Sequence, residues 1–192
     1  MKFEKAKTFI LNKLERELPE DLAYHNIAHT RDVYSAAETL ARLEKIEGED
    51  LTLLLTAVLF HDSGFLETLK EHEQISCRIA QEYLPGYDYT PGQIEWICGM
   101  IMATRIPQTP RNKLEEIICD ADLDYLGRED FFELGERLYE EWYTHGIVSN
   151  EKEWNRLRVS FMEQHRYFTS AAQNLHNAGK DKYLTIIKDQ LA

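Results

Sequence analysis

The segment YHNIAHT, at residues 24–30, contains two histidines at a spacing that suits chemistry. Residues four apart lie on the same side of a helical turn, so His25 and His29 could be two metal ligands, a catalytic pair or polar groups at the start of a helix. Apolar residues recur at helical spacing from Val33 onward, and His29 lies one turn before Val33 in line with them. This phase predicts that His29 points inward, whereas His25 precedes the helix and is not oriented by the same argument.

A histidine-aspartate pair closes the most apolar segment of the chain. Residues 51–60 read LTLLLTAVLF, as expected of a central buried helix, and His61 and Asp62 follow directly. His61 continues the apolar line that passes through Val58. Adjacent residues diverge by about 100° around a helix, so both polar groups can face one point only near its end. The Ser-Gly dipeptide that comes next supplies that end.

A third polar position lies in the segment LEEIICDADLDYL, which begins at Leu114. Its apolar face runs through Ile117 and Ala121 at helical spacing. Asp122 lies just beside that face, whereas Asp120 and the third aspartate of the segment point mostly elsewhere. We therefore expect one buried carboxylate here, from Asp122, with Asp120 as the alternative if the helix boundary is displaced.

These groups together predict a metal site. A buried carboxylate is costly unless a positive charge compensates it, and a metal ion is the natural compensator inside an apolar bundle. The candidate ligands form a set of two histidines and two carboxylates from three helices: His29, His61, Asp62 and Asp122. Mixed nitrogen and oxygen ligation suits a divalent ion such as Fe, Mn, Zn or Ni, and less readily Mg.

Helical periodicity dominates the rest of the chain, and no alternating strand pattern is present. Thr90-Pro91 with Gln93, and Asn112 with Glu115, are helix-start signals, while Gly48, Gly127 and Gly179 occur where helices should end. The predicted helices cover about 3–17, 29–46, 50–61, 71–84, 91–103, 113–126, 129–145, 151–176 and 180–191.

These elements predict a single all-α domain over residues 1–192. Its metal-binding core would span about residues 20–126, and about residues 129–192 would pack onto it as a C-terminal helical appendage. There is no low-complexity linker or internal repeat that would argue for a second domain.

Composition narrows the functional classes. The chain of 192 residues carries 34 acidic and 22 basic residues, a net charge of −12, which argues against binding to nucleic-acid backbone or anionic membrane. Its three cysteines form no close pair, which favours reduced thiols in a cytoplasmic protein. The N-terminal segment is charged throughout, unlike a signal peptide, and the most apolar run is too short to cross a bilayer.

Three further histidines lie in the C-terminal part. His165 falls on an apolar stripe with no motif around it, so we interpret it as a core or interface histidine. His145 and His176 are expected near helix ends, in contact with solvent.

In this order and at this spacing, four segments resemble the HD superfamily of metal-dependent phosphohydrolases. They are YHNIAHT, AVLFHDSGF, HEQISCRIA and DADLDYLG, within about residues 20–126. The resemblance implies an all-α HD-domain bundle with a metal centre, in which His29, His61, Asp62 and Asp122 are the ligands. Where a second metal exists in the family, the aspartate of the HD pair bridges both ions, and that role would belong to Asp62.

The segment YHNIAHT also resembles the Tyr-His-Asn-x-x-His segment of HD-type cyclic-nucleotide phosphodiesterases. There the second histidine binds metal and the first protonates the leaving oxygen. By this resemblance His29 is a ligand and His25 a catalytic general acid, a role suited to an imidazole. A hydrogen-bonding or helix-capping role for His25 is the alternative.

The chain also departs from the family pattern. His72 matches the first of the additional histidines found in two-metal members, as a second-metal or phosphate contact or as a helix-start residue that bonds a neighbour. The next histidine would be expected near residues 102–104, which read MAT. A six-ligand di-iron centre is therefore not expected, and cyclic-nucleotide specificity does not carry over. Lys70 and Arg105 border the expected pocket and could hold a phosphate.

The predicted function is metal-dependent hydrolysis of a phosphate monoester or diester in a small molecule, with a nucleotide as the preferred substrate. Asp62 would orient the attacking water and His25 would protonate the leaving oxygen. The alternative is a sensor or interaction module that keeps the bundle and binds a nucleotide or a partner without turnover. The oligomeric state does not follow from the sequence.

Overall fold

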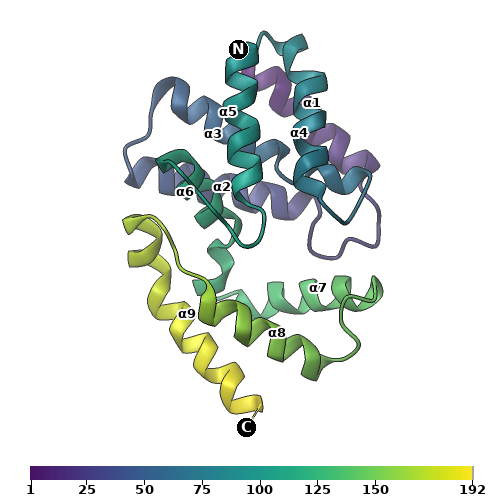
Figure 1. Ribbon diagram of the computed structural model, residues 1–192, viewed down its shortest axis with the longest axis vertical. Helices are drawn as coiled ribbons and strands as arrows, with labels where there is room; N and C mark the ends of the chain where they lie inside the picture. The colour runs from purple at the N-terminus through teal and green to yellow at the C-terminus, as the bar shows by residue number, and fades with distance from the viewer. Residues whose placement is uncertain (192) are drawn as a thin grey trace.

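A computed structural model describes residues 1–191, and within them every regular element is helical. The predicted all-α class is confirmed. The α-helices and short 3₁₀ helices (η) run in the order shown in Figure 1: α1 (Phe3–Glu17), α2 (Ile27–Leu43), α3 (Gly48–Phe60), η1 (Ser63–Leu66), α4 (His72–Tyr83), η2 (Leu84–Tyr87), α5 (Pro91–Ala103), α6 (Lys113–Asp122), η3 (Asp124–Gly127), α7 (Phe131–Thr144), α8 (Glu151–Gln164) and α9 (Ser170–Leu191).

Helix α3 is the centre of the first bundle. All eight residues from 53 to 60 are buried, and α1, α2, α5 and α6 pack against the helix. The segment LTLLLTAVLF has no polar face because neighbouring helices surround it, and a helix that is apolar all round is stable in water only when it is buried in this way. In Figure 1 the helices α1–α6 form the upper part of the molecule, and α7, α8 and α9 lie below them.

Local signals set several helix starts. Thr90 accepts a hydrogen bond from the backbone N–H of Gln93, and the Gln93 side chain accepts one from Thr90, so the predicted capping box of α5 is confirmed. Asn112 caps α6 as predicted, accepting from two backbone N–H groups of its first turn. Gly48 was predicted to end a helix, but it has φ +64° and is the first residue of α3, whereas α2 ends earlier, at Leu43.

The predicted division of the last helices is wrong. Instead of one helix over 151–176 and another over 180–191, the structure has a break at residues 165–169. Asp120 of α6 stabilises this break, because its carboxylate accepts hydrogen bonds from the backbone N–H groups of Phe168 and Thr169 and from the Thr169 hydroxyl. Thr169 in turn accepts a bond from Ala172 N–H and so caps α9. A tertiary contact therefore interrupts a pattern that is locally helical.

Gly179 does not end a helix, contrary to the prediction, because α9 continues through it. A Cβ at Gly179 would lie 2.0 Å from the carbonyl oxygen of Gly127, and a Cβ at Gly127 would lie 2.4 Å from the carbonyl oxygen of His176. Both glycines are needed for the close approach of α9 to η3. This contact joins the C-terminal helix to the end of the first bundle.

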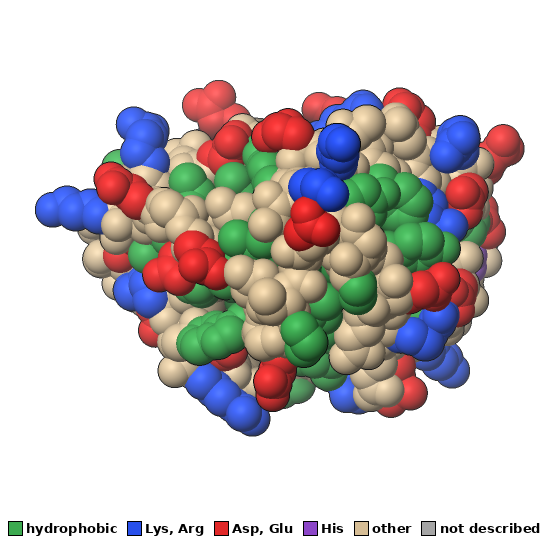
Figure 2. Space-filling model, turned by 90° about the horizontal axis from the view of Figure 1, so that it is seen from above, with side chains coloured by type: hydrophobic (Ala, Val, Ile, Leu, Met, Phe, Trp, Pro, Cys, Tyr) green, Lys and Arg blue, Asp and Glu red, His purple; other side chains and the backbone are tan. Residues whose placement is uncertain are grey.

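Figure 2 shows the molecule from the end at the top of Figure 1, where lysine and arginine side chains alternate with aspartate and glutamate. No continuous basic surface covers the face shown, in keeping with the acidic overall charge. Among the described residues, no helix combines the length and apolarity needed to span a lipid bilayer.

Candidate metal centre and adjoining cavity

The turn after α3 places the HD pair. His61 and Asp62 follow Phe60, and η1 begins at once, so the two side chains leave the helix at its end as predicted. Ser76 of α4 supports this turn, donating to the carbonyl of His61 and accepting from the N–H of Gly64. A Cβ at Gly64 would lie 1.9 Å from the carbonyl oxygen of His72, so glycine there lets the start of α4 reach the HD turn.

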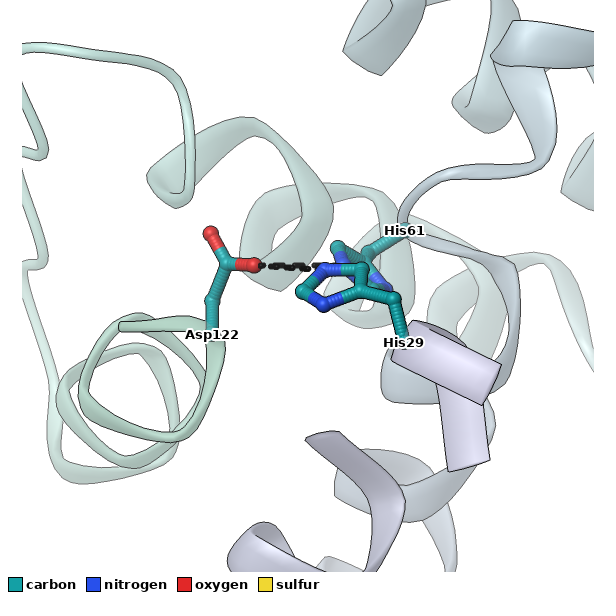
Figure 3. Close-up of side chains that lie close together, drawn as sticks. All are labelled: His29, His61 and Asp122. Carbon is teal, nitrogen blue, oxygen red and sulfur yellow. Dashed lines mark ion pairs between the residues drawn. The ribbon is translucent and has the colours of Figure 1, made fainter. Parts of the chain in front are cut away.

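Three side chains from three elements converge beside this turn (Figure 3). One ligand atom from each of His29, His61 and Asp122 lies within 4.8 Å of the others. The carboxylate of Asp122 is 3.4 Å from Nε2 of both histidines. Oδ2 of Asp62 joins the group, 3.3 Å from Nε2 of His29 and 3.2 Å from Nε2 of His61. His29 and Asp122 thus point inward, which is the orientation that helical phase predicts.

The donor atoms of this cluster suit a divalent metal. Nε2 of His29, Nε2 of His61 and Oδ2 of Asp62 are buried and make no hydrogen bond. Because Nδ1 of His61 lies 2.7 Å from the carbonyl oxygen of Val58, which can only accept, the proton of the neutral ring is on Nδ1. Its Nε2 lone pair is then directed at the cluster, the usual arrangement for a metal-ligating histidine. Buried polar atoms without partners are rare, and a bound cation would satisfy all of them.

The candidate ligands also compensate one another's charges. Burial alone would lower the pKa of His29, but Asp122 and Asp62 outweigh it and raise that pKa to about 9. Burial alone would raise the pKa of Asp122, and the His29 and His61 imidazoles instead lower it to about 2. The charges of the candidate ligands thus stabilise one another.

Asp62 presents its two carboxylate oxygens to different histidines. Oδ2 faces the cluster, and Oδ1 lies 3.4 Å from Nε2 of His72. The ring of Phe65 stacks on both the His72 ring and the His25 ring, with centroids 4.1 and 4.5 Å away. This geometry is compatible with the predicted bridging role of Asp62. Thr104 lies in the MAT segment, where two-metal members of the family would have a further histidine, and its hydroxyl donates to the carbonyl of Ile101.

His25 is held apart from the cluster by a residue that sequence reasoning missed. Its Nδ1 contacts a carboxylate oxygen of Glu141, and the other oxygen of Glu141 accepts from the backbone N–H groups of Tyr24 and His25 at 2.8 and 2.9 Å. Burial raises and the contact with His25 lowers the pKa of Glu141, and the net shift is downward. The sequence did carry a signal for Glu141: it is a charged residue on the apolar face of the predicted helix 129–145, one turn after Leu138.

A cavity of about 450 Å³ lies against the candidate site. Its polar lining includes His25, Asp62, His72 and Asp122, from the first bundle. Apolar and aromatic side chains of α7 and α8 line much of the remainder. The cavity therefore combines polar groups near the predicted ligands with several large apolar side chains from the C-terminal helices, a form common to small-molecule sites.

Neither Lys70 nor Arg105 is among the residues that line this cavity. Both are exposed, and Arg105 lies 3.5 Å from Glu71 in the turn before α4. The guanidinium group of the cavity wall belongs instead to Arg158 of α8.

The expectation of a single buried carboxylate near Asp122 is wrong. Asp120 is completely buried and Asp124 nearly so, but Asp120 has its partners in the break before α9 and Asp124 has one in α9. Asp124 lies 2.6 Å from Nε2 of His176, so the prediction of a solvated His176 is also wrong, because α9 packs on η3 there. His165 is buried as predicted, and His145 is partly buried, 3.7 Å from Asp21.

Two solved structures share the fold of this chain. One is a predicted HD superfamily hydrolase from an uncultured Thermotogales bacterium, with TM-score 0.63 and 20% identity over 96% of this chain and 87% of that protein. The other is a protein from Lactobacillus plantarum, with TM-score 0.64 and 18% identity over 99% of this chain and 98% of that one. No family model and no curated protein sequence matches the chain. At these identities the similarity establishes the fold, and function depends on the site.

Proposed function

We propose that this protein is a metal-dependent hydrolase of phosphate monoesters or diesters in small molecules, with nucleotides as the preferred class. The observation that carries the proposal is the convergence of three unpartnered buried donor atoms, from His29, His61 and Asp62, with Asp122 at the wall of a cavity. The structural similarity to a protein described as an HD superfamily hydrolase supports it.

The four ligands His29, His61, Asp62 and Asp122 would hold one divalent ion. When bound, such an ion lowers the pKa of a water ligand to near neutrality and offsets charge on phosphoryl oxygens. Asp62 accepts a proton or hydrogen bond from the attacking water and orients it in line with the leaving oxygen.

His25 protonates the leaving oxygen. Its Nδ1 is engaged by Glu141, so Nε2 is the nitrogen that remains to donate, and His25 lines the cavity. An alkoxide is a poor leaving group, and proton donation removes that obstacle. Glu141 fixes the orientation of the His25 ring, as carboxylates do for catalytic histidines.

Replacement of Asp122 tests the proposal, with Asp120 as the matched control two residues away. Asp122→Asn should lose bound metal, measured by elemental analysis of the purified protein, and at least about 100-fold in kcat/KM for phosphate esters. Asp120→Asn should keep the metal, because Asp120 bonds the start of α9, and should lower the melting temperature instead.

The result that contradicts the proposal is equally definite. A metal-loaded protein that turns over no nucleotide and no generic phosphate ester is not a phosphohydrolase. If that protein still binds nucleotides in a thermal-shift assay, the non-catalytic sensor is the correct function.

A further inference from the structure

The cavity has a second half that metal-centred hydrolysis does not require. Trp154 and Phe161 of α8, together with Leu138 and Trp142 of α7, form an apolar wall, which we call the aromatic wall. Its apolar surface extends to the cavity mouth, where Ile106 and Leu157, which also line the cavity, are 53% and 43% exposed. Exposed apolar side chains around a cavity mark a surface that binds apolar groups.

Arg158 is the single guanidinium group in this lining. Its Nη2 donates to Oδ1 of Asn155 at 2.7 Å, but no carboxylate of the described chain lies within ion-pair distance, and its buried Nε has no hydrogen-bond partner. Arg128, the other half-buried arginine of this region, pairs with three aspartates. Arg158 is therefore half-buried and has no carboxylate counter-ion among the described residues.

Aromatic rings compensate Arg158 only in part. The guanidinium carbon lies 5.3–5.8 Å from the ring centroids of Phe131, Phe132 and Trp154. Each cation–π contact stabilises a cation by about 0.5–2 kcal/mol, which is less than a hydrogen-bonded carboxylate partner provides to a buried cation. Glu136 and Glu151 act on Arg158 only at longer range. The guanidinium group of Arg158 thus has N–H groups available to donate to a ligand, beside an aromatic surface.

We propose that the aromatic wall binds the leaving group of the substrate as a planar aromatic ring, and that Arg158 binds an anionic or carbonyl acceptor carried by that ring. This inference rests on the proposed function and gives it a substrate class: an aromatic alcohol phosphate with an acceptor on the ring, as a nucleobase also offers. The phosphoryl group would lie at the polar end near Asp62, and the ring at the α7–α8 end.

Arg158 in this account is a specificity residue, and the aromatic wall contributes to KM. Ring burial against Trp154 and Phe161 adds apolar burial and stacking energy that an aliphatic leaving group cannot match. A hydrogen-bonding site rejects analogues that lack the acceptor more strongly than an apolar pocket distinguishes size.

The test compares three esters whose leaving alcohols are of similar acidity: ethyl phosphate, benzyl phosphate and 4-carboxybenzyl phosphate. With metal-loaded protein we expect kcat/KM to rise by about tenfold at each step of this series, mainly through KM. Arg158→Met should remove the increase in kcat/KM from benzyl to 4-carboxybenzyl phosphate and leave the increase from ethyl to benzyl phosphate. Arg158→Lys should retain part of the increase that Arg158→Met removes. Phe161→Ala should reduce the first step.

Binding of phosphonates gives a readout that does not depend on turnover. In a Trp96→Phe background, which removes the tryptophan that is not in the cavity lining, benzylphosphonate should change the fluorescence of the two remaining tryptophans at lower concentration than ethylphosphonate. Preferential binding of benzylphosphonate without hydrolysis of any ester would refute the proposed function and the leaving-group role, and would leave the aromatic wall as a ring-binding site.

Equal kcat/KM for ethyl and benzyl phosphate, with equal binding of the two phosphonates, would show that the aromatic wall does not bind an aromatic ring of the substrate. An Arg158→Met variant that melts at lower temperature but keeps the full preference for 4-carboxybenzyl phosphate would show that Arg158 only packs against its aromatic neighbours.

Discussion

At the scale of single residues, the two histidines of YHNIAHT have different surroundings. His29 lies in the four-residue cluster, whereas His25 contacts Glu141. His25 is not among the described residues whose ligand atoms converge with His29, and its Nδ1 is taken by Glu141, so the four-residue spacing does not form a two-histidine clip. Glu141 is 2% exposed and receives three hydrogen-bonding groups, which makes its carboxylate the anchor for the start of α2 as well as for His25.

Glu141→Gln should affect catalysis according to the leaving group. An alkyl phosphate needs the proton that His25 donates, so we expect its kcat to fall by about 100-fold or more. A 4-nitrophenyl phosphate, whose leaving group is stable as an anion, should lose less than about tenfold. Steady-state kinetics on both esters measures the difference.

The control for this prediction is His25→Ala, which should show the same leaving-group dependence. Because the two residues act as a unit, the double variant should be little worse than either single one. Equal losses on both esters would indicate that Glu141 is purely structural.

At the scale of elements, the break between α8 and α9 is a polar junction inside the molecule. His165 ends α8 and is buried, and Lys180 of α9 lies 3.3 Å from its Nδ1 and donates to its carbonyl oxygen at 2.6 Å. Burial first, and then the charges of Lys180 and Arg166, lower the pKa of His165 to about 3. The Phe161 and Tyr167 rings cover its other sides.

This junction predicts a stability change with acid. The folded-state pKa of His165 is below the unfolded value of about 6.5, so its contribution is complete above pH 6.5 and is lost as the pH falls toward 3. Each pH unit in that interval costs up to about 1.4 kcal/mol of unfolding free energy. Urea unfolding from pH 7 to pH 4 should show a shallower dependence for His165→Gln than for the unsubstituted protein. Parallel curves would contradict a neutral buried His165.

At the scale of the whole molecule, the cavity exists because the last three helices are fixed against the first six. Asp120 binds the start of α9, and Gly127 allows the middle of α9 to lie directly on η3. The same connection places Glu141 beside His25 and the aromatic wall opposite Asp62. Loss of this packing should therefore disturb the candidate site at a distance.

Gly179→Ala tests the packing of α9. The added methyl group would meet the carbonyl of Gly127, and we expect a loss of about 1–3 kcal/mol in unfolding free energy with a weaker hydrolysis of phosphate esters. Gly92→Ala is the matched control, because Gly92 is also helical but a Cβ there meets nothing within 4 Å. It should be neutral or stabilising by up to about 1 kcal/mol. Chemical denaturation of both variants measures the contrast.

The sequence by itself determined the helical class and the inward positions of His29, His61 and Asp122. Each of these depends on spacing along one helix, and apolar periodicity reports directly which side of a helix faces the core. The end of α3 was equally local, because Ser63 and Gly64 follow the HD pair at once.

Only the tertiary structure decided the rest. The contact between His25 and Glu141 joins residues 116 positions apart, and the break before α9 depends on Asp120 from another helix. Gly179 was ambiguous in the sequence, because a helix end and a close helix contact both require a residue without a side chain. The orientation of Arg158 toward the cavity likewise depends on how α8 packs against α7. Local periodicity tells which face is buried, but it does not tell what that face meets.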